Sequence, residues 1–111
     1  MGAFETVVDA ALSDGVRVRT VVTAENAWFE GHFPSDPLLP GIAMLALVED
    51  TLRVFAASPV DVAVFHRLRF RHILRPGAPL LATVRKAKTE GAFEFVVDAD
   101  GTLACSGTCM V

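Results

Sequence analysis

The 111 residues predict an α+β domain in which a mostly antiparallel sheet of six strands wraps around one central helix. Three observations support this fold class. Six segments have strand-like patterns, one long segment has helical spacing, and no helix separates the last four strands. Strands joined without crossovers favour antiparallel pairing, and a helix lying across the concave face of the sheet buries both layers. A chain of this length that is 52% hydrophobic is sufficient for one domain, over residues 1–111.

The chain is expected to begin with a hairpin. Residues 4–12 have a strand-like pattern, the tripeptide SDG supplies a turn, and residues 16–24 read VRVRTVVTA. Apolar and polar residues alternate in the second segment, which is typical of a strand with one buried face.

Residues 25–40, ENAWFEGHFPSDPLLP, contain three prolines and several aromatic rings. They are too interrupted for regular structure and too apolar for a solvated linker, so an ordered loop is expected. From Pro40 to about Ala57, apolar residues recur at helical spacing, and Ser58 and Pro59 end the pattern. The middle of this helix is apolar nearly all round, which predicts burial on most sides.

Four further strands are expected after the helix. Their sequences are VFHRLRFRHIL, PLLATVRKAK, AFEFVVDAD and TLACSGTCMV, separated by short segments that are rich in glycine and proline or contain Asp-Gly. Cys105 and Cys109 lie in the last of them, and their Cα atoms would be about 13 Å apart in a strand. This separation excludes a disulfide, so both are interpreted as core-facing thiols.

Composition and charge argue against several classes of function. The formal net charge is -3, which argues against a general nucleic-acid binder. The longest apolar run, PLLPGIAMLALV, ends at Glu49 after a dozen residues, too few to span a membrane. The first residues have no basic leader, so a cytoplasmic location is expected. No pattern suggests a metal or another cofactor.

The segment WFEGHFPSDPLLPG resembles the signature of the hot-dog-fold 3-hydroxyacyl-acyl-carrier-protein dehydratases of fatty acid synthesis. The family pattern is a Gly-His-Phe-Pro, a proline a few residues later, and a Pro-Gly that opens the central helix. The matching positions are Gly31, His32, Phe33, Pro34, Pro37, Pro40 and Gly41. The downstream segment LRFRHILRPGAPL is also similar to the family, as is the order of elements. The family usually has a short helix before its first strand, and no such helix is expected within this sequence.

The resemblance implies roles for several residues. His32 would act as the base, which an imidazole can do at neutral pH. The backbone N–H of Gly41, at the positive end of the helix dipole, would polarise the thioester carbonyl, and glycine would let the substrate approach. Phe33, Pro34 and Pro40 would contact the substrate.

The family acid, fourteen positions after the histidine, is replaced by Ala46. Glu49 and Asp50 lie about one helical turn further along and are candidates for a substitute acid. The competing interpretation is that each carboxylate pairs with Arg53, since the spacings are i, i+4 and i, i+3.

Arg67, Arg69 and Arg71 alternate with apolar residues, so a regular strand would place all three on one face. A solvated face is one interpretation. The other is a docking site for the acidic acyl carrier protein, which the family binds through basic residues.

The function expected from this resemblance is conversion of a 3-hydroxyacyl thioester to the 2-enoyl thioester in fatty acid or polyketide-type biosynthesis. The substrate would be carried by acyl carrier protein or coenzyme A. The alternative, which Ala46 raises, is a catalytically silent hot-dog subunit that binds an acyl carrier or a partner. A hot-dog thioesterase is less favoured, because such enzymes usually activate water with a carboxylate. A homodimer, with higher assembly open, is expected because one short sheet covers only one side of an apolar helix.

Overall fold

A computed structural model describes residues 4–23, 39 and 41–111. Its elements follow the predicted order: β1 (Val7–Ala11), β2 (Gly15–Val21), α1 (Gly41–Ala56), β3 (Val64–Phe70), β4 (Pro79–Lys86), β5 (Ala92–Ala99) and β6 (Thr102–Met110). The expected loop at 25–40 lies outside the described residues except for Leu39, so its predicted order stays a prediction. No helix in the described ranges has the length and apolar character needed to cross a membrane.

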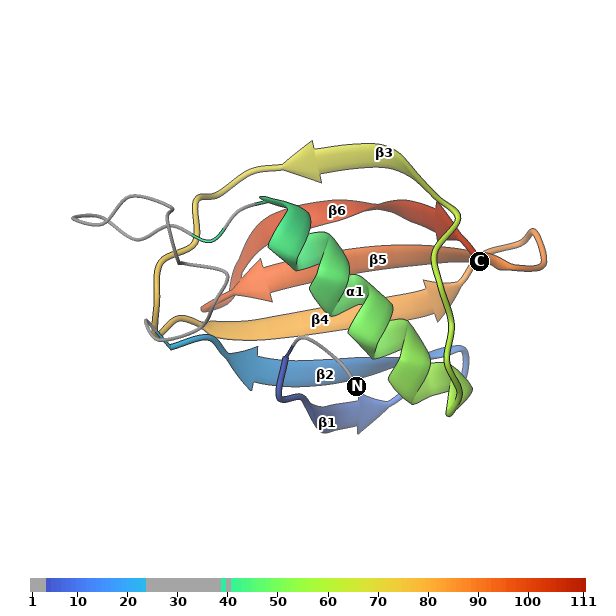
Figure 1. Cartoon of the computed structure of the whole chain (residues 1–111), viewed down its shortest axis with the longest axis horizontal. Coiled ribbons are helices and arrows are strands. Elements are labelled where there is room, and N and C mark those ends of the chain that lie inside the picture. The colour runs from blue at the N-terminus through green and yellow to red at the C-terminus, as the bar shows by residue number, and fades with distance from the viewer. Residues whose placement is uncertain (1–3, 24–38, 40) are drawn as a thin grey trace.

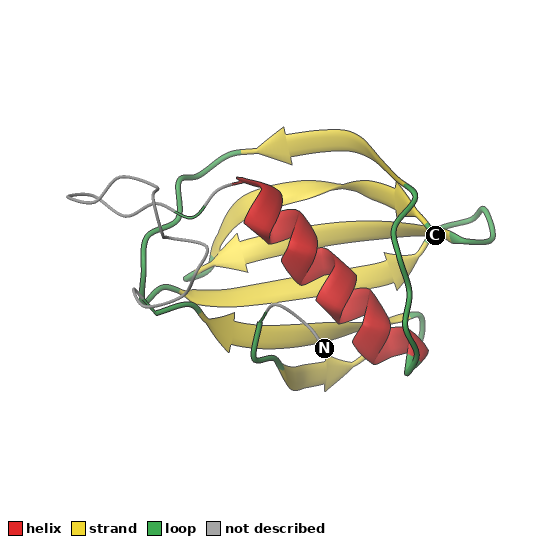
Figure 2. Ribbon diagram, viewed as in Figure 1, coloured by secondary structure: helices red, strands yellow, loops and turns green. Residues whose placement is uncertain are grey.

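The predicted antiparallel sheet is confirmed. All neighbouring strands are antiparallel, in the order β1-β2-β4-β5-β6-β3. The sheet curves around α1, which runs obliquely across its concave face (Figure 1). Figure 2 shows the same two layers, with the helix against the sheet. This is the hot-dog arrangement expected from the sequence.

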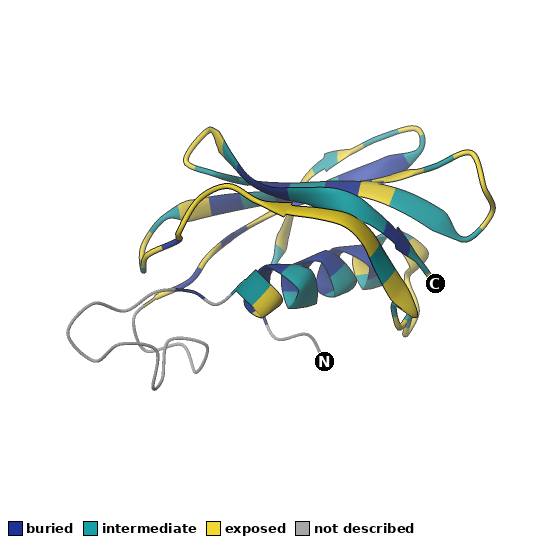
Figure 3. Ribbon diagram, turned by 90° about the horizontal axis from the view of Figure 1, so that it is seen from above, coloured by how far each residue is buried: buried dark blue, intermediate teal, exposed yellow. Residues whose placement is uncertain are grey.

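The core lies between α1 and the sheet. Every second residue of β2 and β4 faces the helix, including Val18 and Val84, both fully buried. From the helix, Leu47, Val48 and Leu52 pack against them at i, i+1 and i+5 spacing. The composition of the helix predicts burial on most sides. The structure shows less burial than this, because the described residues do not cover the helix face turned away from the sheet. Figure 3 shows exposed and half-buried positions along that outer face.

Cys105 and Cys109 are buried on the helix side of β6, as the pattern predicts. Burial raises the pKa of each thiol to about 11, so both stay protonated at neutral pH. A protonated buried thiol is a weak nucleophile, which agrees with a packing role.

The alternation predicted for β3 is interrupted. Its register against β6 shifts between His66 and Arg69, and Arg67 has a φ of 55°. Two residues of β3 therefore oppose one residue of β6, which is a β-bulge. Gly107 of β6 lies opposite the bulge, where a Cβ would be 2.8 Å from Cζ of Phe95, 3.0 Å from the His66 carbonyl oxygen and 3.2 Å from Cδ2 of Leu68. The prediction of one regular face for the three arginines is thus wrong at Arg67.

β3 is one edge of the sheet, and exposed apolar residues gather on it and beside it. Val64, Leu68 and Phe70 on the strand are 42%, 38% and 48% exposed. Ile42 in the first turn of α1 and Ile73 just after the strand are 65% and 66% exposed. An unpaired strand edge flanked by large apolar side chains is a common feature of subunit interfaces.

Candidate active site

The first turn of α1 is held beside the end of β3. Leu39 and Leu74 form an isolated antiparallel bridge, and the Leu39 N–H donates to the Leu74 carbonyl at 2.8 Å. Both leucines are buried, so the bridge is shielded from water. Two residues later, α1 begins at Gly41. The first-turn N–H groups of a helix have no intrahelical acceptor, and the dipole makes this end favourable for a carbonyl oxygen that gains negative charge.

Gly41 is in close contact with an aromatic ring. A Cβ at this position would lie 3.1 Å from Cε1 of Phe70, closer than most side chains approach. The sequence suggested that glycine is needed for substrate approach. The structure provides a second reason, which is the packing of the Phe70 ring against the helix. Neither the pattern PG nor the pattern FR indicates this contact, because 29 positions separate the two residues.

His32, Phe33, Pro34 and Pro40 lie outside the described residues. Their roles therefore stay predictions from the motif. Of the matched signature, the described part is Gly41, which starts α1 as the family pattern requires.

Ala46, at the position of the family acid, is half-buried and packs against the core cluster. It brings no proton donor to this part of the helix. The nearest carboxylates, Glu49 and Asp50, both have partners in the structure.

Glu49 binds the segment that leads from α1 to β3. Its Oε2 accepts a hydrogen bond from the Val62 N–H at 3.0 Å. Its negative charge adds to the burial effect that raises the pKa of Cys109. The predicted pairing with Arg53 is not what the structure shows for Glu49.

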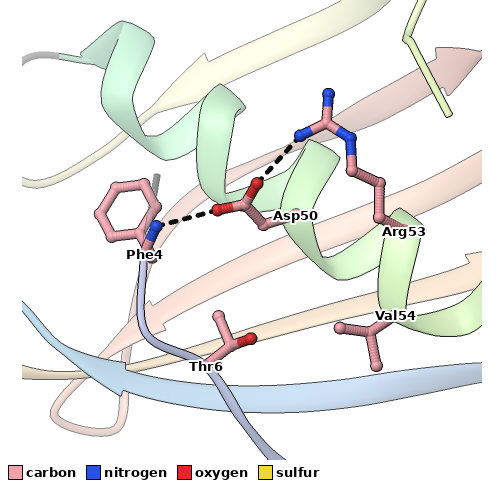
Figure 4. Close-up of a pocket in the computed structure, with 5 residues that line it drawn as sticks. All are labelled: Phe4, Thr6, Asp50, Arg53 and Val54. Carbon is pink, nitrogen blue, oxygen red and sulfur yellow. Dashed lines mark hydrogen bonds and ion pairs between the residues drawn. The ribbon is translucent and has the colours of Figure 1, made fainter. Parts of the chain in front are cut away.

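Asp50 is buried, with 5% exposure, and both of its carboxylate oxygens accept hydrogen bonds. One oxygen accepts from the Phe4 N–H at 3.0 Å, and the other accepts from Nη1 of Arg53 at 3.0 Å (Figure 4). Arg53 also donates to the Val60 carbonyl and to Asp61. The i, i+3 pair with Arg53 was predicted, although as a surface pair. The bond to Phe4 spans 46 positions and has no sequence signal.

A small pocket of about 230 Å³ adjoins this carboxylate. The residues that line it are Phe4, Thr6, Asp50, Arg53 and Val54. Both Asp50 oxygens already accept hydrogen bonds from residues that line the pocket. Asp50 therefore has a structural role, which is to hold the N-terminal segment against the helix.

Arg67 and Arg69 of β3, and Arg71 just after it, differ from two arginines that form ion pairs. Arg17 pairs with Asp9 at 2.6 Å and Arg85 with Asp14 at 2.8 Å. Arg67, Arg69 and Arg71 are exposed and have no ion pair with any described residue. Their charges are therefore not neutralised by the described part of the chain. The same part contains no group of three or more side chains suited to a metal ion.

Two comparisons with known proteins both identify dehydratases as relatives of this chain. The model of ApeI-like dehydratases, described as ApeI dehydratase, matches residues 9–108. A protein of Shewanella sediminis named 3-hydroxyacyl-[acyl-carrier-protein] dehydratase FabZ is 30% identical over 102 residues, which cover 80% of this chain and 67% of that protein.

Solved structures agree on the fold. The dehydratase heterocomplex ApeI:P from Xenorhabdus doucetiae has a TM-score of 0.81 at 23% identity, covering 96% of both chains. A hypothetical thioesterase protein with coenzyme A from Streptococcus pneumoniae has a TM-score of 0.71 at 14% identity, covering 96% of this chain and 84% of the other. The fold alone therefore does not separate these activities.

Fold and sequence together define a hot-dog protein of the dehydratase class. The chain belongs to the ApeI-like dehydratase family, because the family model covers nearly all of it.

The structural environment of Asp50 leads to a stability prediction. Asp50→Ala should lower the free energy of unfolding by about 2–4 kcal/mol, because it leaves the Phe4 N–H and the Arg53 guanidinium without their acceptor. Asp50→Asn should cost less, since its amide oxygen can still accept from Phe4. Asp61→Ala, which removes an exposed partner of the same arginine, is the matched control and should change stability little. Urea unfolding measures all three. Equal stability of Asp50→Ala and native protein would contradict the assignment.

Proposed function

We propose that this protein is a 3-hydroxyacyl-acyl-carrier-protein dehydratase-like enzyme, which converts a 3-hydroxyacyl thioester to the 2-enoyl thioester and water. The observation that carries the proposal is the family match over residues 9–108, together with a Gly-His-Phe-Pro motif that leads into α1 at Gly41. The proposal extends to fatty acid or polyketide-type biosynthesis as the setting.

The reaction needs three groups. A base removes a proton from the carbon next to the carbonyl, hydrogen-bond donors stabilise the enolate-like charge, and an acid protonates the departing hydroxyl group. In this proposal His32 is the base and the Gly41 N–H is the donor. Phe33, Pro34 and Pro40 contact the acyl group.

No residue is assigned as the general acid. Ala46 has no proton to give, and the carboxylates of Glu49 and Asp50 already accept hydrogen bonds from Val62, Phe4 and Arg53. Recruiting either carboxylate as a substitute acid would require it to leave these partners, and for the buried Asp50 this loss is costly. These contacts support an acid-deficient site. They also favour the second candidate function, a catalytically silent hot-dog subunit that binds an acyl carrier or a partner.

A docking role for Arg67, Arg69 and Arg71, in and just after β3, is part of the proposal. The absence of ion pairs between Arg67, Arg69 or Arg71 and any described residue supports it, because unneutralised guanidinium groups attract an acidic carrier protein at long range. A substrate carried by coenzyme A would also bring negative phosphates to this surface.

The first prediction concerns assembly. The protein should form a homodimer in which the two sheets join edge to edge at β3 and the two α1 helices face each other. The exposed apolar residues on and beside β3 would be buried in that interface. In such a dimer the site is shared, with His32 from one subunit and the Ala46 position from the other. Sedimentation at micromolar concentration measures the mass, and a stable monomer would contradict the prediction.

The second prediction concerns the base. His32→Ala should fold normally and lose dehydration of 3-hydroxyacyl thioesters by about 10²–10⁴-fold, the usual contribution of a placed base. His32→Asn keeps a hydrogen-bonding side chain and should be equally inactive, which separates proton transfer from loop capping. Enoyl absorbance follows the reaction, and circular dichroism checks the fold. Full turnover in a folded His32→Ala protein would refute the role.

The third prediction concerns the acid. Ala46→Glu should raise the dehydration rate by about 10²–10⁴-fold, because it supplies a general acid that partial burial keeps protonated. Stability should fall by about 1–3 kcal/mol. The comparison includes native protein, Glu49→Gln and Asp50→Asn. Loss of activity in either amide variant, with folding intact, would instead identify a substitute acid. Inactivity of all four proteins would favour the silent subunit.

A further inference from the structure

The aromatic ring beside the first turn of α1 lies in a position to select substrates. Cε1, Cζ and Cδ1 of Phe70 are 3.1, 3.3 and 3.4 Å from the place that a Cβ of Gly41 would occupy. One edge of the ring therefore fills the lateral space at the start of the helix. The side chain is nevertheless 48% exposed, so the rest of the ring faces outward from the core.

The ring is held by rigid neighbours on both sides. Phe70 pairs with Cys105 of β6, and the next N–H, that of Arg71, donates to the Ala104 carbonyl at 2.7 Å. The start of the helix is fixed by the bridge between Leu39 and Leu74. The sheet therefore supports the Phe70 ring, and the bridge supports the helix end beside it. The ring is a preorganised wall of the candidate site, and displacing it would cost more than moving a loop residue.

The wall lies beside the donor that the proposed function assigns. A carbonyl that accepts from the Gly41 N–H would place its oxygen about 2.9 Å from that nitrogen, roughly along the helix axis. Its two substituents, the sulfur and the carbon next to the carbonyl, then spread sideways from the axis. One of these sideways directions is already occupied by the Phe70 ring, which leaves little width for a branch on the adjacent carbon.

We propose that Phe70 is a specificity-determining residue, which restricts the site to thioesters without a branch on the carbon next to the carbonyl. This inference rests on the proposed function, because it takes the Gly41 N–H as the carbonyl donor. A ring that acts only in subunit contact would affect the mass of the assembly and the overall rate, but not the preference between two substrates that differ by one methyl group.

The test compares 3-hydroxybutyryl and 2-methyl-3-hydroxybutyryl thioesters of N-acetylcysteamine. The native protein should prefer the unbranched substrate by about 10–200-fold in kcat/KM, the usual range for one methyl group in a closed pocket. Phe70→Ala should reduce this ratio about tenfold or more, because the branch then fits where the ring was. Phe70→Leu, which keeps an apolar side chain and is the safer variant for folding, should reduce it by less.

Val64→Ala is the matched control, because it removes an exposed apolar side chain from the other end of β3. It should leave the substrate ratio at the native value. An unchanged ratio in folded Phe70→Ala or, if that variant does not fold, in Phe70→Leu would overturn the inference and leave the proposed function intact. Where native turnover is slow, the same series is made with Ala46→Glu. Absence of turnover with both native protein and Ala46→Glu would overturn the proposed function and this inference together.

Discussion

The structure depends on the packing of α1 across the concave face of the sheet. Alternate residues of β2, β4, β5 and β6 turn their apolar side chains to the same side, and one stripe of the helix fills the space between them. Burial of this apolar area is the dominant favourable term in folding. It also fixes the direction of the helix, and hence the position at which its first-turn N–H groups emerge.

The candidate site is built at that end of the helix by elements distant in sequence. The Leu39–Leu74 bridge holds the chain just before α1, and β3 brings Phe70 against Gly41. Both contacts place backbone donors next to an apolar surface, where hydrogen bonds to a developing negative charge are strongest. Phe70 at the end of β3, and Ile42 and Ile73 beside it, are exposed at the same end of the molecule. The predicted subunit contact would therefore lie in the same region of the surface as the candidate site, as the proposed shared active site requires.

The helix carries two adjacent carboxylates that serve the fold. Glu49 holds the segment after the helix, and Asp50 holds the N-terminal segment and Arg53. A buried carboxylate is tolerated when it is paired and hydrogen-bonded, and each oxygen of Asp50 has a partner. Together these bonds hold the N-terminal segment and the segment after the helix against the middle of α1. The acid position of the family, one turn earlier, is occupied by a methyl group that packs against the core.

The sequence by itself determined the order of elements, the antiparallel sheet, the central helix and the family. These follow from local period and from a motif whose residues are close together, so no long-range contact has to be known. Tertiary structure alone decided three features: the bond from Phe4 to Asp50, the packing of Phe70 on Gly41, and the bulge that breaks the alternation at Arg67. Each of these features depends on which distant segments come into contact. The same local sequence pattern is compatible with several different long-range contacts, so the pattern alone cannot identify them. The roles of His32, Phe33, Pro34 and Pro40 rest on the motif, because they lie outside the described residues.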